Sequence, residues 1–333
     1  MPQVSLTGIK PTGAPHLGNY VGAIRPALQL TESHDEAYYF VADYHALTTE
    51  RDPALVREYT LQVAAAWLAC GLDPERTVFY RQSDVPETFE LQWVLSCVTP
   101  KGMMNRAHAY KAAVDAAPDP DTADAGVNMG LYNYPVLMAA DILVMDADVV
   151  PVGSDQMQHI EYTRDLVERL NAWIGEEHAL KVPSAVAVAA EASVVGLDGR
   201  KMSKSYGNQI PLFADRDELW KLVKRFKTDS TPLEDPKDVD AAIVQLHDLF
   251  ATPEQTADLH ARLRAGGIGW GHVKQELTEV LDTALGPIRA RYEALMADPA
   301  GLDRVLAEGG ERARARARQV LASVRAGVGI DRG

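Results

Sequence analysis

The sequence predicts an α/β protein whose first part holds a parallel sheet and whose second part is all-helical. Two observations support this. Strand-like and helix-like segments alternate up to about residue 171, and the pattern is almost wholly helical after about residue 212. With 47% hydrophobic and 24% charged residues, the 333-residue chain has the composition of ordinary globular proteins. We place the α/β domain at residues 1–210, with a helical insertion at about 87–144, and a helical domain at 211–333.

The first domain alternates short apolar runs with longer amphipathic segments. Strand, helix, strand is the order of a parallel sheet with right-handed crossovers. Such sheets bind ligands beyond the carboxyl ends of their strands, and the glycine-rich turn after the first strand lies there. Strands are expected at 4–7, in the first half of 37–48, within 75–86 and at 148–153. Helices are expected at 19–30, 53–70 and 154–171, and through most of 87–144 apart from a loop at 115–126.

Composition excludes several classes of protein. No apolar run approaches the roughly 20 residues that a membrane helix needs. The N-terminus lacks the basic and apolar regions of a secretory signal, so we expect a cytoplasmic protein without a membrane partner. Two cysteines are too few for a disulfide framework. The net charge of −14 argues against indiscriminate nucleic-acid binding and leaves a selective polyanion partner open.

The turn after the first expected strand carries the motif PHLGN, residues 15–19. A glycine-lined turn that opens a helix exposes backbone N–H groups and the positive end of the helix dipole, which suits phosphates. His16 and Asn19 are three residues apart and project to one side of that turn, where both can donate to phosphate oxygens. An ordinary loop histidine is the alternative.

A second motif, KMSKS, spans residues 201–205. Lys201 and Lys204 flank small hydroxyl residues, with Arg200 before them and glycines nearby that let the loop move. Flexible ammonium groups suit a triphosphate whose charge shifts during a reaction. A solvated basic loop is the alternative, and the presence of PHLGN in the same chain makes it much less favourable.

Together, HLGN and KMSKS resemble the two nucleotide-binding motifs of class I aminoacyl-tRNA synthetases. The segments TGIKPTGAPHLGNYVGAI, YPVLMAADILV and VPVGSDQMQHIEYTRDLVERLN resemble the tryptophanyl-tRNA synthetases more narrowly, over nearly the whole chain. The resemblance implies a Rossmann-type catalytic domain, ATP with Mg²⁺, L-tryptophan and tRNA(Trp) as partners, and a homodimer. Tyrosyl-tRNA synthetases are the nearest relatives and the main alternative.

Asp141 is a lone carboxylate inside the apolar run LYNYPVLMAADILVM. Burying it without a partner would cost several kcal/mol or raise its pKa, so we expect it to have one. Tyr134 lies two helical turns before it on the same face, with Met138 between them. An apolar slot with one acceptor suits an indole, whose single polar group is an N–H donor. Purely structural roles for Asp141 and Tyr134 stay open at this stage.

The resemblance assigns roles to further residues. It implies that Asp141 accepts the indole N–H, that Gln156 and Tyr134 hold the substrate ammonium, and that His45 lies beside the substrate. Asp43, on the same side of the strand as His45, is more consistent with a structural role. His159, Glu161 and Arg164 could support residues of the site or lie on the surface, and both roles stay open at this stage. The catalytic set is His16, Asn19, Lys201 and Lys204; the ATP-binding set is Lys10, Thr12, Gly18, Asn19, Gly153, Asp155, Met202, Ser203 and Ser205; the substrate-binding set is Lys10, His45, Tyr134, Met138, Asp141 and Gln156.

The chain departs from the family pattern in three places. Lys10 stands where Gln is common, next to the expected substrate carboxylate. The segment NRAHAYKAA, residues 105–113, is shorter than in many relatives, which leaves open which lysine reaches the triphosphate. Tyr206 follows KMSKS where an acidic residue is frequent.

For tRNA contact, the helical part offers two basic segments, KLVKRFK (221–227) and ERARARARQ (311–319). A solvated basic helix is the alternative for the second segment. Two further hypotheses remain for the whole chain: a smaller HxGH-type nucleotidyltransferase, and a non-catalytic relative that only binds ligands. The first does not explain the long helical C-terminal part, and the second does not explain why both motifs are intact. No dedicated metal site is expected, because Mg²⁺ binds mainly through phosphates and water.

Overall fold

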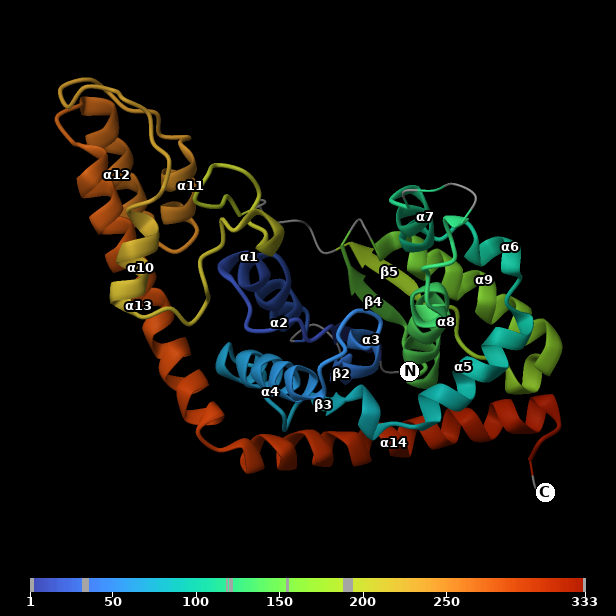
Figure 1. The fold of residues 1–333 in the computed structure, drawn as a ribbon. Coiled ribbons are helices and arrows are strands. Elements are labelled where there is room, and N and C mark those ends of the chain that lie inside the picture. The colour runs from blue at the N-terminus through green and yellow to red at the C-terminus, as the bar shows by residue number, and fades with distance from the viewer. Residues whose placement is uncertain are drawn as a thin grey trace.

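A five-stranded parallel sheet forms the centre of the molecule, in the strand order β3-β2-β1-β4-β5 (Figure 1). The structure is a computed structural model that describes residues 3–31, 36–117, 119, 122–153, 156–187 and 194–331. The strands are β1 (Val4–Ile9), β2 (Glu36–Val41), β3 (Val78–Arg81), β4 (Val149–Val152) and β5 (Ser184–Ala187). The predicted parallel α/β fold is confirmed.

The helices follow the strands in the order that crossover connections require. Before β4 they are α1 (Leu17–Asn19), the π-helical η1 (Tyr20–Ile24), α2 (Arg25–Thr31), α3 (Asp43–Ala46), α4 (Pro53–Ala69), the 3₁₀ turn η2 (Gln82–Asp84), α5 (Glu87–Val98), α6 (Lys101–Met104), α7 (His108–Asp115) and α8 (Met129–Val144). After β4 they are α9 (Met157–Ile174), η5 (Glu176–His178), η6 (Lys204–Tyr206), α10 (Arg216–Val223), α11 (Ala242–Asp248), α12 (Pro253–Ala265), α13 (Trp270–Met296) and α14 (Pro299–Val328).

Helices cover both faces of the sheet. Because successive side chains of a strand point to opposite faces, each strand contributes to both cores. Leu6 and Phe40 belong to one face, which packs with buried residues of α5, α8, α9 and α14. Tyr39 and Phe79 belong to the other face, where they join Trp67 of α4 in a separate core. The near-continuous apolar runs of the sequence are therefore those of a doubly covered sheet.

The strand order reverses direction between β1 and β4, which pair at Ser5 and Val149. Chain connections leave this point toward opposite edges of the sheet, so a crevice opens beyond the carboxyl ends of the two strands. The edge strand β5 was not predicted from the sequence, because its four residues are too few to show an alternating pattern. The first two residues of the helix predicted after β4, 154 and 155, lie outside the described residues.

Helices α10 to α13 share a separate apolar core with Leu17 and Val21 of the first helix. They form a group to one side of the sheet domain, at the upper left of Figure 1. The segment after KMSKS leads into this group, so the core also contains Met202 and Ile210. A movement of these helices would therefore shift residues that pack against the first helix and against KMSKS.

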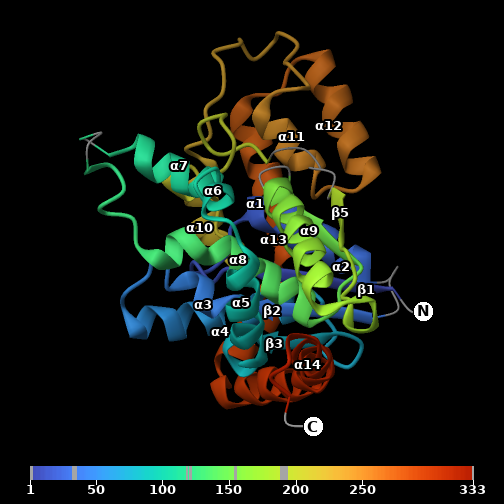
Figure 2. The same ribbon diagram turned by 90° about the vertical axis from the view of Figure 1, so that its right-hand side faces the viewer.

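The last helix, α14, returns to the sheet domain and runs along β3 (Figures 1 and 2). A side chain at Gly309 would overlap the carbonyl oxygen of Phe79, so glycine permits helix and edge strand to meet. Buried residues of α14 belong to the same core as one face of the sheet: Ala313, Ala317, Val320, Leu321 and Val324. The division at residue 210 stays a prediction, and residues 211–333 pack in two places.

The arginines of segment 311–319 bind groups of the sheet domain. Arg314 and Arg318 both donate to Glu87, at 3.0 to 3.2 Å. Arg316 donates to Asp146 at 3.1 Å, and Arg312 donates to the carbonyl oxygen of Pro74 at 2.9 Å. These contacts hold α14 in place, which is neither of the two interpretations considered for this segment, tRNA contact or a solvated basic helix.

Candidate active site

The PHLGN and KMSKS motifs meet in the structure, although some 185 residues separate them. The Leu17 N–H donates to the Ile210 carbonyl at 3.0 Å, and the Leu212 N–H donates to the Pro15 carbonyl at 3.0 Å. The turn of PHLGN is thus paired with the segment that directly follows KMSKS. Backbone pairing of this kind fixes the separation of the two motifs without depending on side-chain charge.

Lys204 reaches across to the first motif, where its ammonium donates to the carbonyl oxygen of Thr12. Gly13 adopts a φ of +91°, which favours glycine, and a side chain there would lie 3.4 Å from the Lys204 nitrogen. Partial burial lowers the pKa of Lys204. Lys201 and Lys204 are both exposed, but among the described residues only Lys204 has a side-chain hydrogen bond to the PHLGN turn.

His16 lies buried beneath this contact, with 8% of its surface exposed. Burial, assisted by the nearby Lys204 charge, lowers its pKa to about 4, so the ring is neutral at pH 7. A neutral imidazole has one donor and one acceptor nitrogen. Its Nδ1 has no hydrogen-bond partner among the described residues. The buried ring thus keeps one unsatisfied polar atom at the PHLGN turn.

Neighbouring residues set the orientation of His16. The side-chain oxygen of Asn19 accepts from the His16 backbone N–H at 3.1 Å. A side chain at Gly18 would lie 2.9 Å from the Nδ1 and Cε1 atoms of the ring, so glycine makes room for the imidazole. The single amide nitrogen of Asn19, with its two hydrogens, stays available as a donor on the same turn.

The KMSKS loop is shaped by Asn208, a residue that the sequence analysis did not select. Asn208 is 3% exposed; it accepts from the Ser203 N–H at 2.9 Å and donates to the Lys201 carbonyl at 3.1 Å. It also donates to Asp198 at 2.7 Å. Its place in KMSKSYGN, three residues after the motif, was the available signal. Met202 is buried, the Ser203 and Ser205 hydroxyls lie 2.8 Å apart, and Arg200 pairs with Asp198.

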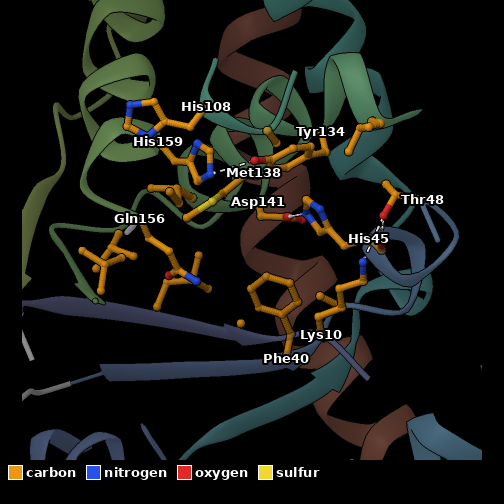
Figure 3. Close-up of a pocket in the computed structure, with 18 of the residues that line it drawn as sticks. Lys10, Phe40, His45, Thr48, His108, Tyr134, Met138, Asp141, Gln156 and His159 are labelled. Atoms are coloured by element: carbon orange, nitrogen blue, oxygen red, sulfur yellow. Dashed lines mark hydrogen bonds and ion pairs between the residues drawn. The ribbon is translucent and has the colours of Figure 1, made fainter. Parts of the chain in front are cut away.

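A cavity of about 590 Å³ lies beyond the carboxyl ends of β1, β2 and β4, against α8 (Figure 3). Apolar side chains such as Phe40 and Met138 form much of its wall. The polar side chains that face it are few and come from five different segments. They are Lys10, His45, Thr48, Thr49, His108, Tyr134, Asp141, Gln156 and His159. An apolar hollow with a few fixed polar groups is the usual form of a small-molecule site.

Asp141 has the partners that its burial requires. Only 3% of its surface is exposed, and it accepts from His45 Nε2 at 2.9 Å (Figure 3). Gln82 Nε2 donates to both carboxylate oxygens, at 2.8 and 3.0 Å. Burial raises the pKa of Asp141, and the hydrogen bonds from His45 and Gln82 oppose that effect. The sequence analysis missed Gln82, whose only signal was its position at the end of the third strand.

Tyr134, Met138 and Asp141 line one wall of the cavity, as their helical spacing predicted. The Tyr134 hydroxyl and His159 Nε2 lie 3.0 Å apart, so His159 belongs to the same group of side chains. Gln156 lines the opposite wall at the start of α9 (Figure 3). All six predicted substrate residues therefore line this one cavity: Lys10, His45, Tyr134, Met138, Asp141 and Gln156.

Lys10 lies at the end of the cavity nearest the PHLGN turn. Its ammonium donates to the hydroxyls of Thr48 and Thr49, each at 3.0 Å. Burial lowers its pKa. Lys10 therefore lies between this cavity and a smaller hollow beside the PHLGN turn.

The other predicted residues divide between structure and site. Asp43 accepts from the backbone and hydroxyl of Ser83 and from the Tyr44 N–H, as a structural carboxylate would. Burial raises its pKa, and these hydrogen bonds oppose the rise. Gly153 is exposed at the end of β4, Thr12 provides the carbonyl that Lys204 binds, and Asp155 lies outside the described residues.

The short segment 105–113 covers the mouth of the cavity. His108 and Ala112 of α7 line it, and the His108 N–H donates to Gln158 of α9 at 3.0 Å. Arg106 and Lys111 are both exposed.

Neither a membrane-spanning helix nor a cluster of metal ligands occurs in the described part of the chain. No helix there is apolar over enough of its length to cross a membrane. The same residues contain no group of three or more His, Cys, Asp or Glu side chains that could hold a metal ion.

Known proteins that are similar to this chain in sequence and fold include tRNA synthetases. Residues 2–286 match the family model described as tRNA synthetases class I (W and Y). The tryptophan–tRNA ligase of Xanthomonas campestris pv. campestris is 54% identical over 98% of this chain and 76% of its own length. That of Neisseria meningitidis serogroup A is 47% identical over 98% of this chain and 97% of its own length.

A solved structure gives the same result. The tryptophanyl-tRNA synthetase of Campylobacter jejuni, solved with ADP and tryptophan, matches with a TM-score of 0.90 and 39% identity. The match covers 98% of this chain and 100% of that one. The paired motifs and the apolar cavity beside them therefore have a family context, and this chain belongs to the class I tRNA synthetases of the tryptophan and tyrosine family.

Proposed function

We propose that this chain is a tryptophan–tRNA ligase, which activates L-tryptophan with ATP and transfers it to tRNA(Trp). The single observation that carries the choice of amino acid is the buried carboxylate of Asp141, set in an apolar cavity. An indole is an apolar ring system with one N–H donor, so one fixed acceptor satisfies it completely. The relatives at 47% to 54% identity are named for the same activity.

In the first step, the tryptophan carboxylate attacks the α-phosphate of ATP and pyrophosphate leaves. The carboxylate is ionised at pH 7, so the step needs no general base. Catalysis then consists of positioning and of stabilising the charge that develops on the phosphates. We assign positioning of the nucleotide to His16, Asn19 and the backbone of the PHLGN turn, and stabilisation of the leaving pyrophosphate to Lys204 and Lys201.

Neutral His16 suits this role because it can donate a hydrogen bond without adding a fixed charge near Lys204. Lys204 now holds a carbonyl of the PHLGN turn, and the same ammonium can exchange that acceptor for a phosphate oxygen. Interactions that tighten only in the transition state raise kcat more than they affect substrate binding. We expect Lys204 to act in this way.

We assign the substrate ammonium to Tyr134 and Gln156, and the edge of the indole to His45 and Met138. Lys10 lies at the junction of the two halves of the crevice, where its ammonium can face the substrate carboxylate. Mg²⁺ accompanies ATP in this proposal. Because the described residues offer no cluster of metal ligands, phosphate oxygens and water would hold it.

We further propose that the protein is a homodimer. An apolar face, here called the α5–α8 face, exposes Trp93, Met129, Tyr44 and Leu47 at 71%, 64%, 42% and 43%. Met129, Tyr44 and Leu47 surround a hollow of about 600 Å³ that shares Thr48 and Tyr134 with the tryptophan cavity. Trp93 lines a second hollow that shares Phe89 and Gln92 with the first. Exposed apolar patches of this kind mark protein interfaces. Replacement of Trp93 by Asp should yield monomers in analytical ultracentrifugation, and an unchanged sedimentation coefficient would contradict the dimer.

For tRNA contact, we favour the basic segment 221–227 over segment 311–319, whose arginines already bind the sheet domain. Lys221, Lys224, Arg225 and Lys227 are all exposed. A protein of net charge −14 needs such a local patch to approach a polyanion. Charge reversal at Lys221 and Arg225 should lower the charging of tRNA at unchanged tryptophan activation; equal loss of both would contradict this assignment. Protein synthesis in the cytoplasm is the setting that this activity implies.

The experiment that tests the proposal is ATP–pyrophosphate exchange with each standard amino acid, followed by charging of tRNA(Trp). Tryptophan should support both reactions. Exchange with tyrosine and none with tryptophan would favour the neighbouring specificity of the family. Absence of exchange with any amino acid would favour a non-catalytic relative.

A further inference from the structure

Gln82 is a buried polar side chain that the reaction as described does not use. It lies in η2, directly after β3, and 1% of its surface is exposed. Its amide nitrogen donates to both oxygens of Asp141, at 2.8 and 3.0 Å. Its amide oxygen accepts from the Tyr44 backbone N–H at 3.1 Å. The side chain therefore links the carboxylate at the base of the cavity to the backbone of α3.

The contact to Tyr44 determines which way the amide faces. A backbone N–H can only donate, so the amide group must turn its oxygen toward Tyr44 and its nitrogen toward Asp141. The opposite orientation would place two donors together at Tyr44 and two acceptors together at Asp141. Both contacts thus support one assignment, in which Gln82 presents a fixed N–H donor to the carboxylate.

We propose that Gln82 is a positioning residue for tryptophan selection, whose amide holds the Asp141 carboxylate in the orientation that accepts the indole N–H. This inference rests on the proposed function. A carboxylate offers about four acceptor directions. His45 occupies one on Oδ2, and Gln82 occupies the side shared by both oxygens. The plane of the carboxylate is then fixed from two directions, and a remaining acceptor direction is left for the ligand.

The same contact preserves the chemical character of Asp141. A buried carboxylate without donors takes up a proton, and a protonated carboxyl presents an O–H where the indole needs an acceptor. Burial raises the pKa of Asp141, while the hydrogen bonds from His45 and Gln82 lower it. Loss of Gln82 leaves His45 as the remaining donor and should weaken binding of a substrate that has the N–H more than binding of one that lacks it.

Two substitutions separate this role from a general structural one. Gln82→Met keeps the length of the side chain and removes both contacts. Gln82→Glu keeps an oxygen for the Tyr44 N–H and replaces only the donor that faces Asp141. Two carboxyls at hydrogen-bonding distance share a proton at low pH and repel each other when both ionise. Ser83→Ala is the matched control, because Ser83 lies in the same turn and binds Asp43.

The assay compares tryptophan with 3-(3-benzothienyl)alanine, which has sulfur in place of the indole N–H. Pyrophosphate exchange gives kcat/KM for both amino acids at several pH values between about 6 and 9. The other titratable side chains around Asp141 are unchanged in every variant: His45 of α3, Tyr80 of β3, and Lys10, Tyr134 and His159 on the cavity wall. Any new pH dependence therefore belongs to position 82.

Wild type and Ser83→Ala should prefer tryptophan strongly, with little change over this pH range. Gln82→Met should lose roughly 10- to 100-fold of that preference, chiefly through KM for tryptophan, since a hydrogen bond to a buried charge is lost. Gln82→Glu should prefer tryptophan at low pH and lose the preference as pH rises. A preference within about twofold of wild type at every pH, in whichever variant folds, overturns the inference. Failure of wild type to use tryptophan contradicts the proposed function itself.

Discussion

Replacement of Asp141 by Asn removes the charge of the buried carboxylate at nearly constant volume. The carboxylate accepts from His45 at 2.9 Å and from Gln82 at 2.8 Å, and in our proposal it also accepts from the indole. Asparagine has one acceptor oxygen and a donor group. It cannot accept from three donors at once, so at least one buried N–H loses its partner.

The size of the effect follows from these contacts. A hydrogen bond to a charged acceptor contributes about 1.5–3 kcal/mol, and an unsatisfied buried donor costs about 1–3 kcal/mol. Rotation of the amide and a change of His45 tautomer offset part of this. We therefore expect kcat/KM for tryptophan to fall by roughly 100- to 1,000-fold, since about 1.4 kcal/mol corresponds to tenfold. KM for ATP should stay within about threefold, because His16 and Lys204, the residues that we assign to ATP, lie at the paired PHLGN and KMSKS motifs.

Tryptophan-dependent pyrophosphate exchange measures both constants in one assay. Asp43→Asn is the matched control, because Asp43 is a partly buried carboxylate of α3, two residues from His45, and binds only Ser83 and Tyr44 among the described residues. That variant should stay within a few fold of wild type. Unchanged tryptophan kinetics in Asp141→Asn, or an equal loss in both variants, would refute the assignment of the indole acceptor.

Three further outcomes follow from the structure. Lys204→Met should lower kcat of pyrophosphate exchange by roughly tenfold or more with smaller changes in KM, and a change confined to KM would contradict a transition-state role. Gly309→Ala should lower the free energy of unfolding in urea by about 2 kcal/mol or more, although Ala usually favours helices, because the new methyl group overlaps the Phe79 carbonyl; equal or greater stability would contradict the close packing. Burial of Glu87 raises its pKa. The hydrogen bonds from Arg314 and Arg318 outweigh this effect and leave the pKa below its ordinary value. Glu87→Gln should therefore be less stable than wild type at neutral pH, and the difference should vanish as pH falls below about 4; a difference that grows on acidification would contradict the ion pair.

The fold was largely predictable because the strands are buried on both faces and separated by long helices. Val4–Ile9, Glu36–Val41 and Val78–Arg81 read as apolar runs for that reason. β5 was not predictable, since Ser184–Ala187 is too short to show a period and owes its strand conformation to pairing with β4. Tertiary contacts decide such segments.

The return of α14 to the sheet was also beyond sequence patterns. Its arginines are spaced for a basic helical face, but their partners Glu87, Asp146 and the Pro74 carbonyl are 170 to 238 residues away in sequence. Periodicity identifies the helix and says nothing of which surface its charges meet. Gly309 carries a physical signal only after the helix is placed against Phe79.

Within the candidate site, the residues in ordered motifs were found and those that support them were missed. Asp141 was noticeable because a lone charge in an apolar run needs a partner, but the sequence does not name that partner. Gln82 and Asn208 provide the missing hydrogen bonds, and each lies in a turn whose polar residues look ordinary. Supporting residues of this kind become visible only when the strand ends are brought together.

The ratio of kcat/KM for tryptophan to kcat/KM for tyrosine in pyrophosphate exchange tests the central claim most directly. The cavity is largely apolar, with Asp141 as a fixed acceptor for a donor-only indole N–H. A phenol hydroxyl is carried on a smaller ring and also brings acceptor lone pairs, so it cannot match the same site, and the ratio should be about 1,000 or more at pH 7.5. A ratio near one, or a preference for tyrosine, would contradict the account.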